Sequence, residues 1–393
     1  MKGQAGLKVL YLFFLMNGFS LASWISRTPA IRNGLSASTE EMGFILFSFS
    51  SGCMAGILSA GKLLNHFSVK ICSLLGMFLL SAGLMLLAAG LGAQSFGLTG
   101  AGLFMFGVGL GWAEVAINIC CAEIERELKK SLMTLLHGFF SLGTFLGALS
   151  GMAASSQNVS TVQHLALVSV LLLVVIVMLM KRFPHTNSNA HDDNKKGYFR
   201  KIFDELKDPS LIVIGIVVLA MALAEGSAND WLPLLMIDGH GFGETQGLMI
   251  YAGFTLCMVV GRFCGTPVVD KLGKFLVLKW SAAAALVGLI TVIFLPSPLL
   301  VAFAVLLWGL GASLGFPLAL STAGESGKNS HLRVTIASTA GYISFLVGPP
   351  ALGFIGEHYT LRLAMVPVAL LILIAFITLV YQARDGRNKA TVR

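Results

Sequence analysis

The chain has 393 residues, of which 56% are hydrophobic and only 12% are charged, and its formal net charge is +8. Such a composition leaves too little polar side chain to cover a water-soluble protein, so we expect the chain to be solvated by a bilayer. The positive charge does not indicate nucleic-acid binding, because the excess Lys and Arg lies beside apolar stretches, where anionic lipid attracts it.

Apolar stretches of about 20 residues recur along the chain, and an α-helix of about 20 residues crosses the hydrocarbon core of a membrane. In chain order they lie near residues 8–29, 41–61, 71–92, 97–121, 132–155, 162–180, 210–236, 245–268, 275–295, 298–322, 333–356 and 361–382. This pattern predicts an all-α membrane protein with twelve transmembrane helices.

Basic residues fall in alternate connections between these stretches. Of the 27 Lys and Arg residues, only Arg27, Arg32 and Arg362 belong to the second set of connections. The positive-inside rule therefore places both termini in the cytoplasm.

Polar side chains inside the predicted spans are the first candidates for a functional site, because they are costly in a membrane. In the first span, Asn17 is expected to face a cavity and bind substrate. The fourth span carries Glu114 and Asn118, and the seventh carries Glu225 and Asn229. Each Glu–Asn pair is four residues apart, so both members project from one helix face.

The chemistry of these pairs suggests their roles. A desolvated carboxylate can exchange protons near neutral pH, so we expect proton coupling at Glu114 and Glu225. Amides hydrogen-bond hydroxyl groups without adding net charge, so Asn118 and Asn229 are predicted substrate ligands.

Further candidates lie near the ends of the spans and in the last third of the chain. Arg27 and Asp230 stand near the outer ends of the first and seventh spans, and we expect them to pair when the outer mouth is shut. Trp308, Phe316 and Tyr342, in the tenth and eleventh spans, either form an aromatic wall for a sugar ring or pack in the core.

The longest polar interval divides six spans from six. We expect an N-terminal six-helix bundle at 1–182, a cytoplasmic linker at 183–208 and a C-terminal six-helix bundle at 209–393. A shift of 205 residues superimposes Gly56 on Gly261 and Asn65 on Asp270, which indicates duplicated bundles.

The turns after the second helix of each half contain a recurring motif. In GTPVVDKLGK (265–274), Asp270 is expected to form a gating contact with Arg262 or Lys271, and Asn65 in GKLLNHFSVK (61–70) a weaker one. The turn at 265–274 resembles the loop signature of the major facilitator superfamily, from which the copy at 61–70 departs. WAEVAIN (112–118) resembles the E-T-A-A-N segment of fucose permeases.

Over nearly all its residues the chain also resembles a bacterial inner-membrane transporter of this superfamily, and this resemblance implies how the protein works. It implies two pseudo-symmetric bundles that rock about a central site between the first, fourth, seventh and tenth helices, in a bacterial inner membrane. We therefore expect a secondary active transporter that works by alternating access, with proton-coupled symport of a small polar, hydroxylated, sugar-like solute.

Other function classes are less consistent with the sequence. The sequence contains no phosphate-binding G-x-x-x-x-G-K-[ST], no G-x-S-x-G and no HExxH or CxxC motif. We expect no enzyme activity, cofactor or metal, and a monomer whose partners are a small-molecule substrate, protons and the bilayer. A drug/proton antiporter, which would want an acid in the first span, and a non-transporting membrane sensor are the alternatives.

Overall fold

The structure is a computed structural model that describes residues 2–128, 132–184, 202, 204–325 and 330–391. The regular elements in this part of the chain are all helical. In chain order they are α1 (Lys2–Ile25), α2 (Thr28–Gly34), α3 (Thr39–His66), α4 (Val69–Gly92), α5 (Phe96–Leu128), α6 (Met133–Ser156), α7 (Thr161–Leu179), η1 (Met180–Arg182), α9 (Pro209–Leu234), η2 (Leu235–Gly239), α10 (Glu244–Leu272), α11 (Lys274–Phe294), α12 (Pro298–Glu325), α13 (Ser330–His358), α14 (Leu361–Ala364) and α15 (Val366–Thr391).

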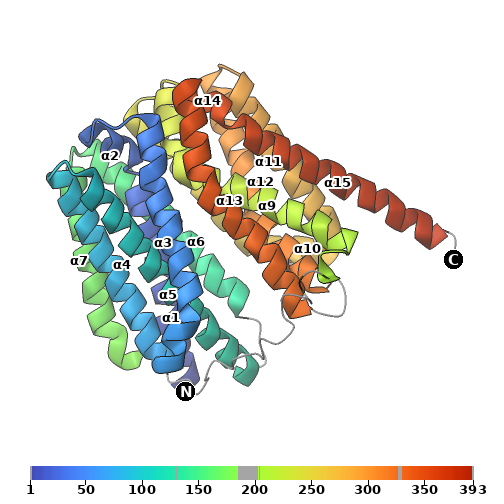
Figure 1. The fold of residues 1–393 in the computed structure, drawn as a ribbon, viewed down its shortest axis with the longest axis horizontal. Coiled ribbons are helices and arrows are strands. Elements are labelled where there is room, and N and C mark those ends of the chain that lie inside the picture. The colour runs from blue at the N-terminus through green and yellow to red at the C-terminus, as the bar shows by residue number, and fades with distance from the viewer. Residues whose placement is uncertain (1, 129–131, 185–201, 203, 326–329, 392–393) are drawn as a thin grey trace.

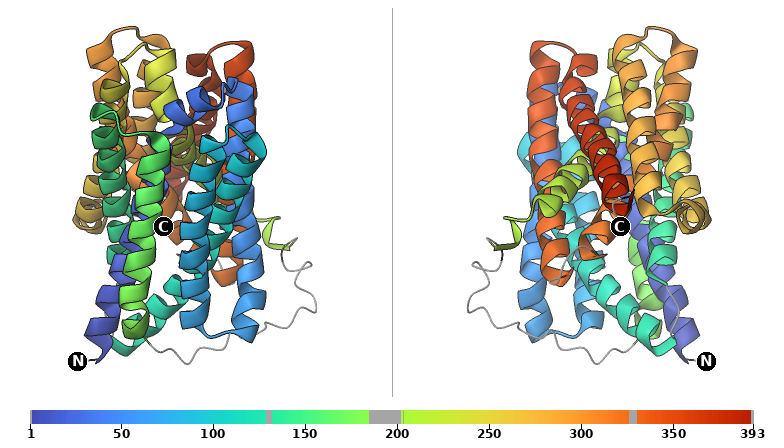
Figure 2. Two further views of the ribbon diagram at one scale, coloured as in Figure 1. Left: turned by 90° about the vertical axis from the view of Figure 1, so that its left-hand side faces the viewer. Right: turned by 90° about the vertical axis from the view of Figure 1, so that its right-hand side faces the viewer.

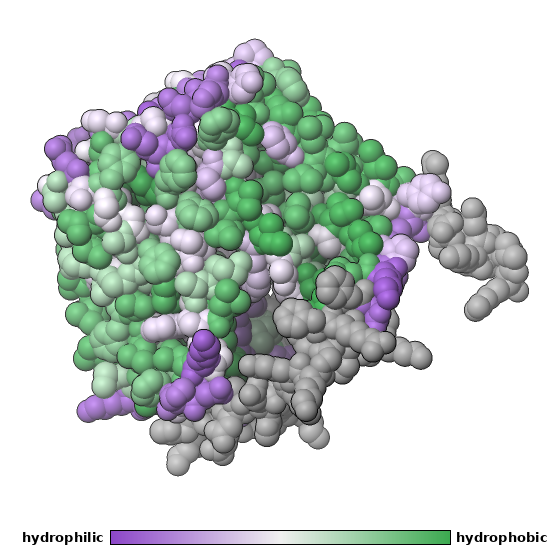
Figure 3. Space-filling model, viewed as in Figure 1, coloured by the Kyte–Doolittle hydropathy of each residue, from purple (hydrophilic) through white to green (hydrophobic). Residues whose placement is uncertain are grey.

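Twelve helices of the described chain are long and apolar enough to cross a membrane, as the sequence predicted. The short helices α2 and α14 are additional, and each lies in a connection beside a span. Figure 3 shows apolar side chains covering the middle of the visible face and polar ones gathering toward its upper and lower edges. A bilayer matches that distribution, because it solvates an apolar band between two polar boundaries.

The helices gather into two groups, which Figure 1 shows side by side: α1–α7 and α9–α15. Within the first group, α5 packs on α3 and α4, and α1 packs on α6. Within the second, α12 packs on α10 and α11, and α9 packs on α13. Across the boundary, α3 packs on α13 and α6 on α10, so the second span of each half meets the fifth span of the other.

The two ends of the molecule carry different elements. The α2 end carries α2, η2 and α14, at the top of Figure 1; the linker end is opposite, where α1 begins and α7 ends (Figures 1 and 2). Most of the predicted linker, namely 185–201 and 203, lies outside the described residues.

Local signals explain where key helices begin. α3 begins with a capping box in which the Ser38 hydroxyl accepts from the Glu41 N–H and the Glu41 carboxylate accepts from the Ser38 N–H. α9 begins with Asp208 as its N-cap, and Pro209 follows at the first helical position. α10 ends at Gly273, whose φ of 80° is a conformation that glycine adopts without strain.

Candidate functional site

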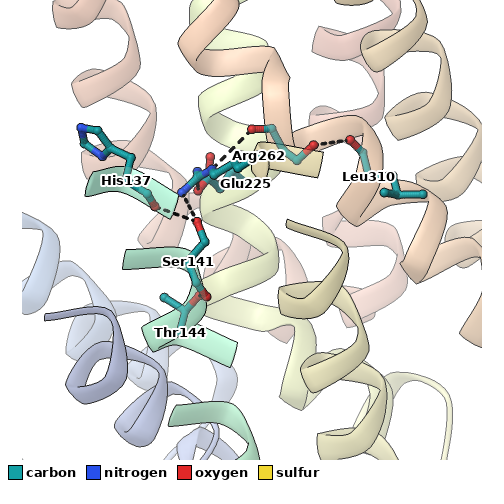
Figure 4. A network of polar contacts seen from close by, with 7 residues as sticks. His137, Ser141, Thr144, Glu225, Arg262 and Leu310 are labelled. Carbon is teal, nitrogen blue, oxygen red and sulfur yellow. Dashed lines mark hydrogen bonds and ion pairs between the residues drawn. The ribbon is translucent and has the colours of Figure 1, made fainter. Parts of the chain in front are cut away.

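Arg262 on α10 bonds to residues of three other helices, α6, α9 and α12 (Figure 4). Its Nη2 lies 2.8 Å from Oε1 of Glu225 on α9. Its Nη1 donates to the Ser141 hydroxyl on α6 at 2.7 Å, and its Nε donates to the Ser313 carbonyl on α12 at 3.4 Å. The bond to Ser141 crosses from one half to the other, so this arginine links the second half to α6.

The ion pair is largely but not wholly buried, since both side chains are 15% exposed. A buried arginine with one carboxylate partner keeps its charge balanced, and loss of one partner leaves the other uncompensated. The Ser141 hydroxyl in turn donates to the His137 carbonyl of its own helix at 3.1 Å. It therefore accepts a hydrogen bond from the guanidinium and donates one to the backbone of α6.

Glu114 on α5 lies within electrostatic range of both Arg262 and Glu225. It is only partly buried, and neither a hydrogen bond nor an ion pair joins it to another described residue. The structure therefore brings the two predicted acids together across the boundary between the halves. It gives them different environments, because Glu225 is paired and Glu114 is not.

The predicted asparagine ligands also lack hydrogen-bond partners within the described part of the chain. Asn17 on α1 is fully buried, and both its Oδ1 and its Nδ2 have no hydrogen-bond partner. Oδ1 of Asn118 is likewise buried and unpaired, while the side chain as a whole is half-buried; Asn229 is half-buried too. Buried amides without partners are uncommon because each costs free energy, so these atoms are available to a bound solute or water.

The three predicted aromatic residues separate into two environments. Trp308 is fully buried, and its indole N–H donates to the Ala224 carbonyl at 3.1 Å. It also meets Phe254 edge-to-face, so it packs within the second half. Phe316 and Tyr342 are half-buried, and Tyr342 lies within electrostatic range of Glu114.

The expected ion pair between Arg27 and Asp230 is not formed. Nη2 of Arg27 instead donates to the Val159 carbonyl at 2.9 Å and to the Thr161 hydroxyl at 3.0 Å, both in its own half. Burial lowers the pKa of the Arg27 guanidinium from its ordinary value, and the charge of Glu244 opposes that change. The nearby carbonyl and hydroxyl oxygens satisfy this cation, so Asp230 is left without it.

The expected contacts of the repeated turns also differ from the sequence prediction. Residues 265–272 continue α10 rather than forming a loop, and Asp270 and Lys271 are exposed, with no ion pair to another residue that the structure describes. Arg262 lies eight positions before Asp270 on the same helix, about 12 Å along its axis, and reaches Glu225 instead. Asn65, on α3, is exposed as well.

Three polar contacts join the halves at the α2 end. Arg32 pairs with Asp238 at 2.6 Å, the Thr39 N–H donates to Glu357 at 2.7 Å, and the Ser155 hydroxyl donates to Glu244 at 2.6 Å.

The backbones also approach closely there. A Cβ on Gly43 of α3 would lie 3.0 Å from the Pro349 carbonyl oxygen of α13, and a Cβ on Gly353 of α13 would lie 3.0 Å from the Gly43 Cα. Between described residues, no hydrogen bond or ion pair joins the halves at the linker end, and Figure 3 shows a recess between them on that side.

Sequence reasoning missed several residues of this region. Ser141, Tyr11 and Tyr251 were not singled out, although the hydroxyls of Tyr11 and Tyr251 are buried without a partner. Tyr11 stacks on Phe139 with ring centroids 4.8 Å apart. Arg262 was named in the sequence as a gating residue, but its partners Glu225 and Ser141 were not foreseen.

Comparisons with known proteins agree with the fold. The family model described as Major Facilitator Superfamily matches residues 9–332. An uncharacterised MFS-type transporter of Yersinia pestis is 27% identical over 363 residues, which cover 92% of each chain. The membrane protein MosC of Rhizobium meliloti is 28% identical over 90% of this chain and 84% of its own.

Solved structures give the same result. The nucleoside transporter NupG superposes with a TM-score of 0.73 at 12% identity, over 97% of this chain and 99% of that one. The E. coli fucose:proton symporter FucP gives 0.65 at 19% identity, over 95% and 97%. At such identities the likeness concerns the fold alone; the resemblance of the fourth span to fucose permeases stays a prediction.

Proposed function

This chain belongs to the Major Facilitator Superfamily, and on that premise we propose that it is a proton-coupled symporter of a small, neutral, hydroxylated solute. The observation that carries the proposal is the unpaired, partly exposed Glu114, which faces the Arg262–Glu225 ion pair between the two halves. The transporter works by alternating access in a bacterial inner membrane.

The distribution of basic residues supports an orientation for this cycle. The linker end carries most of the Lys and Arg residues, so it is the cytoplasmic end, and both termini lie in the cytoplasm. Polar contacts and close backbone packing join the halves at the opposite end. The structure then corresponds to an inward-facing state, in which Glu114 exchanges its proton with the cytoplasm.

The contrast between the two acids supports the assignment of the proton carrier. Glu225 has a counter-cation at 2.8 Å, which balances its charge in every state that keeps the pair. Glu114 has no such partner, so its protonation is free to change with solvent access. We assign proton coupling to Glu114, and to Glu225 the role of fixing Arg262.

The unpaired amides support the solute class. Asn17 and Asn118 present buried donors and acceptors without charge, which suits the hydroxyl groups of a neutral solute. The names of two structural neighbours, a nucleoside transporter and a fucose:proton symporter, point to solutes of the same chemistry. Tyr342 and Phe316, half-buried on α13 and α12, offer ring faces for a sugar or base.

Counterflow in proteoliposomes tests the proposal. Purified protein is reconstituted and supplied with labelled nucleosides, deoxyhexoses and neutral hexoses, each against unlabelled solute inside. We expect at least one of these to exchange, and an inward proton gradient to drive its accumulation. At 100 mV, one proton supplies about 2.3 kcal/mol, equivalent to about 50-fold accumulation.

Glu114→Gln separates coupling from binding. The variant is expected to retain counterflow but to lose the proton-driven accumulation, whereas Glu123→Gln, on the same helix beyond the site, keeps both. Accumulation by Glu114→Gln at the wild-type level removes Glu114 from the proposed role. Exchange of apolar cations, with none of the neutral solutes, overturns the proposed solute class.

A further inference from the structure

Asp230 is an almost completely buried carboxylate that lacks a partner. It lies in the last third of α9, toward the α2 end, and only 6% of its surface is exposed. No hydrogen bond or ion pair connects it with any other described residue. The other acidic side chains of the contacts at this end differ, because Asp238, Glu244 and Glu357 each have a partner in the opposite half.

The surroundings of Asp230 provide no positive charge. Tyr251 on α10 is fully buried within electrostatic range of Asp230, and its hydroxyl is unpaired. Cys53 on α3, in the other half, is also within range. The cations at this end are bound elsewhere: Arg27, the N-cap of α2, bonds to Val159 and Thr161, and Arg32 on α2 pairs with Asp238. Arg362 on α14 donates to the Ile293 carbonyl.

The remaining helices that pack on α9 add nothing that compensates the charge. α13 contributes Tyr342, which faces Glu114 and Cys53, and Glu357, which bonds to Thr39. On α12 and α15 the first titratable side chains after the apolar stretches are Glu325 and Tyr381, toward the linker end.

A carboxylate in this position is strongly destabilised when it is ionised. Burial of an unpaired charge costs several kcal/mol even after relaxation, and the group avoids the cost by binding a proton. When the halves separate at the α2 end, water reaches the carboxyl and stabilises its ionised form. The closed and open arrangements at this end therefore differ in their affinity for one proton.

We propose that Asp230 is a second proton-binding site, reached from the α2 end, whose protonation permits the two halves to close there. The proton comes from bulk water at that end and returns to it on opening, and no covalent bond other than O–H changes. This site goes beyond the proposed function, because it requires neither proton carriage by Glu114 nor any particular solute. It makes the closure of the α2 end sensitive to pH.

The distance between the halves reports closure directly. Spin labels are attached at Asn33→Cys and Tyr359→Cys, both exposed at the α2 end in opposite halves, with Cys257 and Cys264 replaced by serine. Protein without the two introduced cysteines controls for labelling at Cys53. Distance distributions are then recorded in detergent from about pH 5 to pH 9, without solute.

We expect the ratio of open to closed molecules to rise with pH, by up to about tenfold per pH unit where one proton is released. Asp230→Asn, which resembles the protonated acid, is expected to stay closed throughout. Asp238→Asn, which breaks the exposed pair with Arg32, is expected to shift the ratio but to keep its pH dependence.

Three results would overturn the proposal. The first is a wild-type distance distribution that does not change with pH, and this result does not require any variant at Asp230 to fold. The second is a wild-type pH dependence in Asp230→Asn. The third is loss of the dependence in Glu114→Gln, which would place the relevant proton at Glu114 and leave the proposed function intact.

Discussion

The two halves carry the same E-x-x-x-N pattern, but the structure uses it differently in each. In the second half, Glu225 is paired with Arg262 at 2.8 Å. In the first half, Glu114 has no partner, and the neighbouring Asn118 leaves its Oδ1 unpaired. The same spacing thus gives a fixed ion pair on α9 and a group free to change its protonation on α5.

The two acids lie on helices that the repeat does not relate, because Glu225 is on α9, the first span of its half, and Glu114 is on α5, the fourth span of its half. Arg262 lies on α10, next to Gly261, and Gly56 and Ile57 occupy the related positions on α3. The first half therefore has no ion pair at the related place, where Ser20 and Ile57 stand in the positions of Glu225 and Arg262.

Breaking the ion pair between Arg262 and Glu225 is expected to reduce the transport rate more than any other change. Glu225→Gln leaves the Arg262 charge without its partner, and the guanidinium is expected to turn toward Glu114, which lies within electrostatic range. Transport should fall at least tenfold. Glu225→Gln/Arg262→Gln, which removes both charges, should recover part of the rate in the counterflow assay.

That rescue depends on the proposed pairing. If the double variant transports no better than the single one, Arg262 has a role that does not depend on balancing Glu225. Circular dichroism and the elution volume of both variants serve as controls for folding.

Removal of the hydrogen bond between Arg262 and Ser141, which joins the two halves, should have an intermediate effect on transport. Ser141→Ala removes the hydroxyl that accepts from Nη1 of Arg262 at 2.7 Å, and hydrogen bonds to charged groups contribute about 1.5–3 kcal/mol. We expect a several-fold change in the exchange rate with little change in apparent affinity. Ser150→Ala, elsewhere on α6 and within the first half, is the matched control; an equal effect there would indicate a general loss of helix packing.

Substitution of Asn118 and of Asn229 compares how much the first and the second half contribute to solute binding. Asn118→Ala removes a buried acceptor available to the solute, so the apparent affinity should fall by about fivefold to tenfold, as expected for one hydrogen bond. Asn229→Ala should change it less, because α9 presents a neutralised acid beside it. Equal losses for the two variants would contradict the asymmetry between the halves.

The smallest expected effect is on thermal stability and comes from substitution of Asp208, the N-cap of α9. Asp208 accepts from the Ser210 N–H as N-cap and from Arg333 Nη1 at 2.7 Å, and these bonds lower the pKa of its carboxyl. Asp208→Ala should lower the melting temperature in detergent by a few degrees, and Asp208→Asn by less, since Asn keeps the cap.

The pH dependence of this effect has a defined sign. A lowered pKa in the folded state means that the contribution of the charge is present above the ordinary pKa of about 4 and is lost as the pH falls through the lowered value. The difference between wild type and Asp208→Asn should therefore shrink in acid. A difference that grows in acid would contradict the pairing with Arg333.

The sequence predicted the spans well because each depends only on a local run of apolar residues. It also placed Glu114 and Glu225 beside polar neighbours on their helix faces, which the structure then brings within electrostatic range of one another. It did not predict that Arg262 reaches Glu225, nor that Arg27 bonds to Val159 and Thr161. A partner for a long cationic side chain depends on which helix lies opposite, and spacing along one helix does not contain that information.

The coupling assigned to Glu114 is tested most directly by measuring protons and solute together. Proteoliposomes containing an internal pH dye, held at zero membrane potential, receive the solute identified by counterflow. We predict that solute entry acidifies the lumen in wild type and that Glu114→Gln admits the solute without acidification. Equal acidification per solute molecule in the two proteins would contradict the account.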